Sequence, residues 1–79
     1  MTEDDVFLPM WTVYENPSDY PNLFVARRFD LVRGEPEPRA TGNVLAASSL
    51  FELRGMLPIG LRRIPRLHED EPQVVEVWI

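Results

Sequence analysis

The sequence contains no cysteine and no lysine, and it has a single histidine, His68. The lack of cysteine excludes disulfide bonds and thiolate metal sites. One histidine cannot supply the usual ligand set of a zinc centre, so His68 is interpreted as a solvated turn residue. No apolar run reaches the roughly 18–20 residues that span a membrane, and the acidic start is unlike a secretory signal. We therefore expect a cytoplasmic protein without a cofactor, a metal or a membrane contact.

Positive charge is also scarce. The net charge is −5, and Glu3, Asp4 and Asp5 supply three of those charges. Residues 6–79 hold ten acidic residues against eight arginines, a balance of −2. General affinity for nucleic acid depends on neutralising many phosphates. Nucleic acid is therefore kept only as a second, less favoured partner.

The chain length of 79 residues allows one domain and no second core. Residues 1–9 are interpreted as an acidic, partly disordered tail, and residues 10–79 as a single α+β domain. A domain of this size is marginally stable unless dense aromatic packing or oligomerisation helps it.

Two strands joined by a turn are expected in the first half of the chain. Residues 10–14 and 23–32 are rich in β-branched and aromatic residues. Residues 16–21 between them contain asparagine, aspartate and two prolines, which favour a turn, and the short connection predicts an antiparallel hairpin. Residues 33–39, with one glycine and two prolines, predict an exposed loop. Residues 43–46 predict a short strand or the entry to a helix.

A short helix is expected after Ser48 and Ser49. The run from Ser49 to Glu52 fits a capping box, in which the hydroxyl accepts from the Glu52 amide and the Glu52 carboxylate reaches back to the Ser49 amide. Pro58 ends the helix. The apolar spacing predicts one buried stripe formed by Leu50, Leu53, Met56 and Leu57. Residues 61–64 and 74–79 predict two further strands.

These elements predict a small antiparallel or mixed sheet of four to five strands with one short helix packed on one face, in the order β-β-(β)-α-β-β. Alternation places Val75, Val77 and Ile79 on one side of the last strand and Val74, Glu76 and Trp78 on the other. The strands at 10–14 and 74–79 thus carry large apolar residues on both faces, more than one helix of about two turns can cover. Monomeric proteins seldom expose such a surface, so we expect a homodimer or another protein as partner. The alternative is a strongly twisted sheet with residues 6–8 folded over the second face. The candidate interaction surface is aromatic and consists of Trp11, Tyr14, Tyr20 and Trp78.

The clustered arginines form a candidate basic strip if the strands at 23–32 and 61–64 are neighbours. Arginine beside exposed aromatic residues suits single-stranded nucleic acid or phosphorylated ligands. The favoured alternative is cross-strand pairing with Glu15, Asp30 and Glu76. The residues of the strip are Arg27, Arg28, Arg62, Arg63 and Arg66.

Three other groups of polar residues each have a functional and a structural interpretation. Tyr14, Asp19, Tyr20 and Arg27 form either a small polar site at the hairpin or a turn held by an Asp–Arg pair. The acidic run at 69–71 lacks the ligand spacing of a calcium loop and is interpreted as a solvated turn. Ser48 and Ser49 have no neighbouring base, so a cap is favoured over a nucleophile.

Several motifs together resemble a group of small bacterial proteins with a domain of unknown function. They are W-T-V-Y at 11–14, D-Y-P at 19–21, F-V-A-R at 24–27, S-L-x-E-L-R-x-M-L-P at 49–58 and V-E-V-W at 75–78. The resemblance covers residues 10–79 and implies a bacterial origin. It implies no activity and no site residue.

The leading interpretation is a non-enzymatic protein-interaction module that self-associates through an apolar sheet face. The alternative is a weak nucleic-acid or nucleotide binder that uses the basic strip. An enzyme would require a carboxylate such as Glu15 or Asp19 to act inside a pocket.

Overall fold

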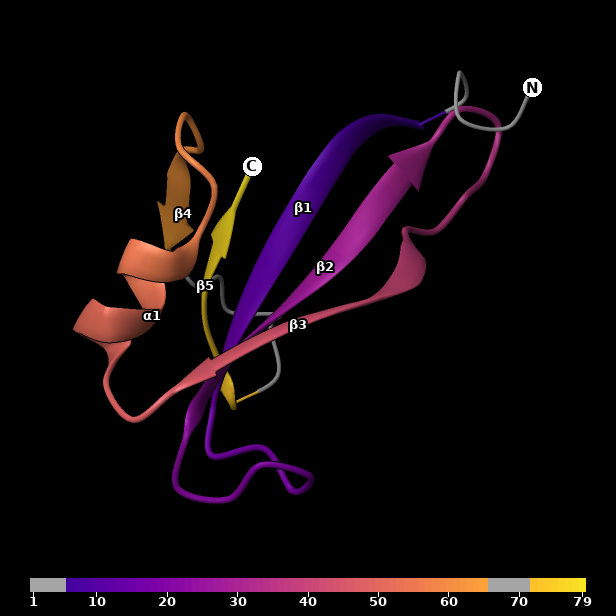
Figure 1. The fold of residues 1–79 in the computed structure, drawn as a ribbon. Coiled ribbons are helices and arrows are strands. Elements are labelled where there is room, and N and C mark those ends of the chain that lie inside the picture. Colours follow the sequence, from indigo (N-terminus) through magenta and orange to yellow (C-terminus); the bar gives the residue numbers. More distant parts are fainter. Residues whose placement is uncertain (1–5, 66–71) are drawn as a thin grey trace.

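The structure is a computed structural model that describes residues 6–65 and 72–79. For residues 6 and 7 it describes the backbone alone. Five strands and one helix follow in the order β1 (Val6–Glu15), β2 (Phe24–Val32), β3 (Arg39–Ala47), α1 (Leu50–Met56), β4 (Arg63–Pro65) and β5 (Val74–Trp78). The strands form one sheet in the order β3-β2-β1-β5-β4, and every neighbouring pair is antiparallel (Figure 1). The predicted small antiparallel sheet with one short helix is therefore confirmed.

The strands at the start of the chain are longer than predicted. β1 begins at Val6 rather than at residue 10, and β3 spans nine residues from Arg39 rather than four. Val6 pairs with Val32 and Leu8 with Leu31, so residues 6–8 extend the sheet. The alternative in which these residues fold over the second face is wrong.

The turn between β1 and β2 depends on two asparagines in the left-handed region. Asn16 has φ 56° and Asn22 has φ 66°, a conformation that asparagine tolerates better than most residues. The Asn22 amide donates to Asn16 Oδ1 at 2.7 Å, and the Asn16 amide donates to the Leu23 carbonyl at 2.8 Å. The predicted hairpin is thus closed by its own side chains.

Helix α1 begins and ends where the sequence predicts. Ser49 is the N-cap, and its hydroxyl accepts from the Glu52 amide at 3.1 Å. The second half of the predicted capping box is wrong, because the Glu52 carboxylate accepts from the Ser48 hydroxyl at 3.0 Å instead. Leu57, before Pro58, is already extended.

The core lies between α1 and one face of the sheet, which we call the helix side. Leu53 and Leu57 cluster with Trp11, Val13 and Ala26. Met56, predicted to be buried with them, is 48% exposed because it lies at the margin of the apolar stripe.

Candidate functional site

The helix side contains a buried carboxylate, Glu76, whose side chain is 1% exposed. Arg54 of α1 forks onto it, with Nε donating to Oε2 at 2.9 Å and Nη2 donating to Oε1 at 2.6 Å. The Trp78 indole donates to Oε2 at 2.8 Å, and Arg63 Nη1 lies 3.9 Å from Oε1. The hydrogen bonds from Arg54, against the opposing effect of burial, hold the pKa of Glu76 below its ordinary value. This cluster joins α1 to β4 and β5.

On the opposite side of the sheet, which we call the reverse face, residues 6–65 and 72–79 place no helix (Figure 1). Residues paired across antiparallel strands point to the same side. Leu8 pairs with Leu31, Met10 with Phe29, and Thr12 with both Arg27 and Val77. Val44 and Ile64 stand at the two edges and are 37% and 36% exposed. The apolar residues that define this face are Leu8, Met10, Phe29, Leu31, Val44, Ile64 and Val77.

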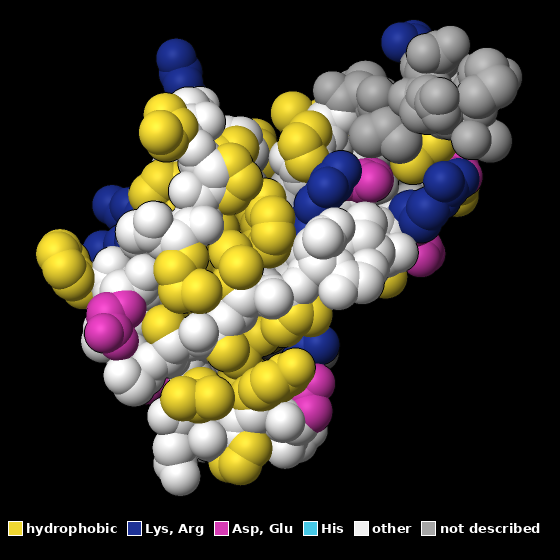
Figure 2. Space-filling model, viewed as in Figure 1, with side chains coloured by type: hydrophobic (Ala, Val, Ile, Leu, Met, Phe, Trp, Pro, Cys, Tyr) yellow, Lys and Arg dark blue, Asp and Glu magenta, His cyan; other side chains and the backbone are white. Residues whose placement is uncertain are grey.

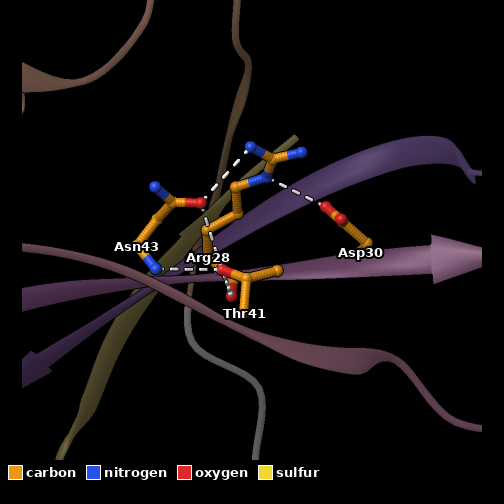
Figure 3. A network of polar contacts seen from close by, with 4 residues as sticks. All are labelled: Arg28, Asp30, Thr41 and Asn43. Carbon is orange, nitrogen blue, oxygen red and sulfur yellow. Dashed lines mark hydrogen bonds and ion pairs between the residues drawn. The ribbon is translucent and has the colours of Figure 1, made fainter. Parts of the chain in front are cut away.

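The two sides differ most at the arm, which we define as residues 8–10 of β1 with residues 28–31 of β2. The arm projects past β5, which pairs with β1 only between Trp11 and Tyr14 (Figure 1). On the helix side of the arm, Arg28 Nε donates to Asp30 Oδ1 at 2.9 Å and Arg28 Nη1 to Asn43 Oδ1 at 3.4 Å (Figure 3). Charged side chains accordingly lie over this part of the molecule in Figure 2, whereas apolar ones gather between α1 and the sheet. The reverse face of the same arm is apolar.

The hairpin end of the reverse face holds a polar aromatic cluster. Arg27 Nη2 donates to Asp19 Oδ1 at 2.6 Å and to Oδ2 at 2.5 Å. The guanidinium carbon lies 5.6 Å from the centroid of the Tyr14 ring and 5.9 Å from that of Tyr20, within cation–π range. The hydrogen bond from Arg27 lowers the pKa of Asp19. An open hollow of about 420 Å³ beside the pair is lined by Tyr14, Pro17, Ser18, Asp19, Arg27 and Gln73.

This cluster contains the four residues that the sequence analysis grouped at the hairpin. The Asp19 and Arg27 side chains are 53% and 29% exposed, and the hollow is open to solvent. An exposed carboxylate that is paired with a guanidinium is a weak general base, because the cation stabilises its charged form. The geometry therefore fits a braced turn better than a catalytic pocket.

The candidate basic strip does not form as predicted. β2 and β4 are separated by β1 and β5. Arg28 pairs with Trp11 on the helix side, so Arg27 points to the reverse face. Arg63 of β4 lies 3.9 Å from Glu76 of β5, a cross-strand neighbour of the kind that the alternative interpretation expected, whereas Arg28 pairs with Asp30 within its own strand. Arg62 is exposed and its backbone pairs with Ile79, whereas Arg66 lies outside the described residues.

The four aromatic residues of the candidate interaction surface do not share one face either. Trp11 is 7% exposed in the core on the helix side, and Trp78 pairs with it across the sheet. Tyr14 points to the reverse face, and Tyr20 lies in the hairpin turn. The prediction was wrong for the tryptophans because α1 covers their side of the sheet.

Neither the role of Arg54 nor the arm was predicted from the sequence. One signal for Arg54 was available, because Glu76 is a lone charge in the apolar run V-V-E-V-W and requires a partner if it is buried. His68 and the acidic run at 69–71 lie outside the described residues. Within residues 6–65 and 72–79, no group of three or more acidic or histidine side chains is arranged to hold a metal ion.

Comparison with protein families, with curated sequences and with solved structures gave no match. In the part of the chain that the structure describes, no helix has the length and apolar character needed to cross a membrane.

Proposed function

We propose that this chain is a non-enzymatic protein-interaction module that self-associates through the reverse face of its sheet. The observation that carries the proposal is the distribution of polarity on the arm. Its helix side is polar and its reverse face is apolar, although α1 covers neither side of it. If both sides of the arm faced water, no physical reason would place Leu8, Met10, Phe29 and Leu31 together on one of them.

A second copy suits this face because the face is self-complementary. Arg27 is the one charged residue that the reverse sides of β1, β2 and β5 contribute, and Asp19 neutralises it. Two copies related by a twofold axis therefore meet without opposing like charges, although each chain carries −5. Met10 and Phe29 are already partly buried in the single chain, so association adds a fraction of the roughly 1.5–3 kcal/mol that complete burial of such a side chain contributes. Several such residues offset the entropy cost of association.

The test is the molar mass by light scattering across a hundredfold range of concentration. The wild-type chain is expected at twice its mass of 9.2 kDa. Phe29→Glu places a charge beside Met10 on the reverse face of the arm and is expected to give the monomer mass. Phe51→Glu is the matched control, because Phe51 lies on α1, is 87% exposed and is expected to leave the dimer intact.

Circular dichroism of both variants shows whether the fold survives the substitution. A wild-type mass of 9.2 kDa at every concentration would refute self-association, whatever the variants do. If Phe51→Glu dissociated the dimer and Phe29→Glu did not, the interface would lie at α1 rather than at the reverse face.

A further inference from the structure

The two edge strands of the sheet, β3 and β4, differ in how well they are protected against pairing with a further strand. β4 is three residues long and ends in Pro65, which has no amide to donate. The first half of β3 is irregular, because its register with β2 shifts between Arg27 and Phe29. There Thr41 Oγ1 donates to the Arg28 carbonyl at 2.9 Å, and the Asn43 amide donates to Thr41 Oγ1 at 3.1 Å. An irregularity of this kind protects an edge against pairing with a further strand.

The second half of β3 lacks these protections. Residues 44–47 pair with residues 24–27 of β2 in an unbroken register. Their sequence, V-L-A-A, contains no charge, no proline and no glycine. A four-residue section of regular, apolar edge therefore remains.

The hydrogen-bond pattern fixes which backbone groups of this section point outward. The Asn16 amide bonds to the Leu23 carbonyl, and bonded pairs alternate along an antiparallel ladder. In the same register, Tyr14–Val25 and Thr12–Arg27 are bonded pairs, so Phe24 and Ala26 direct their backbone groups to β3. Phe24 and Ala26 pair with Ala47 and Leu45. The amides and carbonyls of Val44 and Ala46 consequently face away from the sheet.

We infer that this section of β3 is a docking edge for an extended peptide segment of a partner protein, uncharged at its centre and basic at its ends, which adds as a sixth strand. Side chains of the added strand would lie beside Val44 and Ala46 on the reverse face and beside Leu45 and Ala47 on the helix side, and all four neighbours are apolar. The inference names the partner class of the proposed interaction module and in that sense rests on it.

A short peptide suits this edge better than a second copy of the chain. Stable protein–protein interfaces bury about 1,200–2,000 Å² in total, more than a four-residue edge contact can bury. Two chains of −5 each would also repel one another at so small a contact. A peptide with cationic ends avoids that repulsion.

The probe is the acetylated and amidated peptide Lys-Val-Ile-Val-Thr-Lys, titrated into isotope-labelled protein and followed by amide NMR shifts. The largest shifts are expected at Val44 and Ala46, and the exchange of these two amides with solvent is expected to slow. Ala46→Pro removes an outward amide but no bond to β2, so it is expected to weaken binding at least tenfold. Ala46→Ser keeps the amide and is the matched control.

A second measurement leaves the protein unchanged. Two further peptides are N-methylated at one central residue each, and the two methylated residues are adjacent. Their affinities for the protein are expected to differ, because only one of the two amides faces β3. Equal affinity for the two methylated peptides, or equal affinity of the wild-type chain and Ala46→Pro for the unmodified peptide, would overturn the inference. So would the absence of any amide shift at millimolar peptide, or shifts at Phe29 and Met10 in place of β3.

The molar mass is measured on the same samples. A dimer that ignores the peptide refutes the docking edge alone. A monomer that binds the peptide at β3 refutes self-association and leaves the docking edge standing.

Discussion

Each side of the sheet carries an arginine that donates two hydrogen bonds to a carboxylate, but the two ion pairs differ in how much they contribute to stability. Glu76 is 1% exposed and receives Arg54, Trp78 and the more distant Arg63, so its charge is fully partnered inside the core. Asp19 is 53% exposed and its pair with Arg27 lies over two tyrosine rings at the surface. The comparison teaches that burial, rather than bond length, decides how much such a pair contributes to stability.

The largest effect is expected from Arg54→Ala, which leaves Glu76 buried with weaker partners. Removing one partner of a buried ion pair costs about 3–5 kcal/mol, and the remaining Trp78 bond places the expected loss near the lower end of that range. Urea denaturation measures the change in the free energy of unfolding. A loss below about 1 kcal/mol would show that Glu76 is well hydrated without Arg54.

Acid is expected to remove the stability that Glu76 contributes to the fold. The pKa of Glu76 is lower in the folded chain than its ordinary value of 4.5, so Glu76 stabilises the fold above that pH. This contribution is lost as the pH falls below 4.5 through the folded value. Glu76→Gln is expected to flatten the fall in the thermal midpoint between pH 5 and pH 2. A profile unchanged by Glu76→Gln would assign acid sensitivity to other carboxyl groups.

A smaller effect is expected at the start of α1, which the Arg54–Glu76 pair holds near its other end. Ser49→Ala removes the acceptor for the Glu52 amide and is expected to cost about 1 kcal/mol. Ser48→Ala is the control, because Ser48 only donates to the exposed Glu52 carboxylate. Equal losses in the two variants, measured by thermal unfolding, would contradict the assignment of Ser49 as the cap.

The smallest effect is expected from Asp19→Asn, because exposed ion pairs contribute little to stability. Its pKa is lowered by the Arg27 hydrogen bond, so any stability it adds is present at neutral pH and disappears in acid. Raising the salt concentration is expected to abolish the difference from wild type. A loss comparable to that of Arg54→Ala would remove the distinction between the two sides.

Local features of the fold were predictable from the sequence. Alternation placed Trp11 and Val13 opposite Tyr14, and Ser49 and Pro58 marked the ends of α1. Alternation failed in β5, because the register shift opposite Val13 and Tyr14 leaves Val75 as an extra residue. Val74 thus lies with Tyr14 on the reverse face, whereas Glu76 and Trp78 lie on the helix side. A bulge depends on both strands and is not encoded in either one alone.

Long-range features could not be predicted in this way. The basic strip required β2 and β4 to be neighbours, and no local pattern specifies that β5 pairs with β1 instead. The Arg54–Glu76 pair joins residues 22 positions apart through that same choice. The apolar reverse face was predicted in outline, but the tryptophans were assigned to it because the covered side was unknown.

The position of β5 between β1 and β4 also sets an order of events during synthesis. The hairpin of β1 and β2, then β3 and α1, consist of neighbours along the chain and can form as they leave the ribosome. β1 remains an open edge until β5, translated some sixty residues later, pairs with it. During that interval the apolar strand β1 has an unpaired edge at which other strands can pair wrongly, and the sheet is complete only when β5 has paired with it.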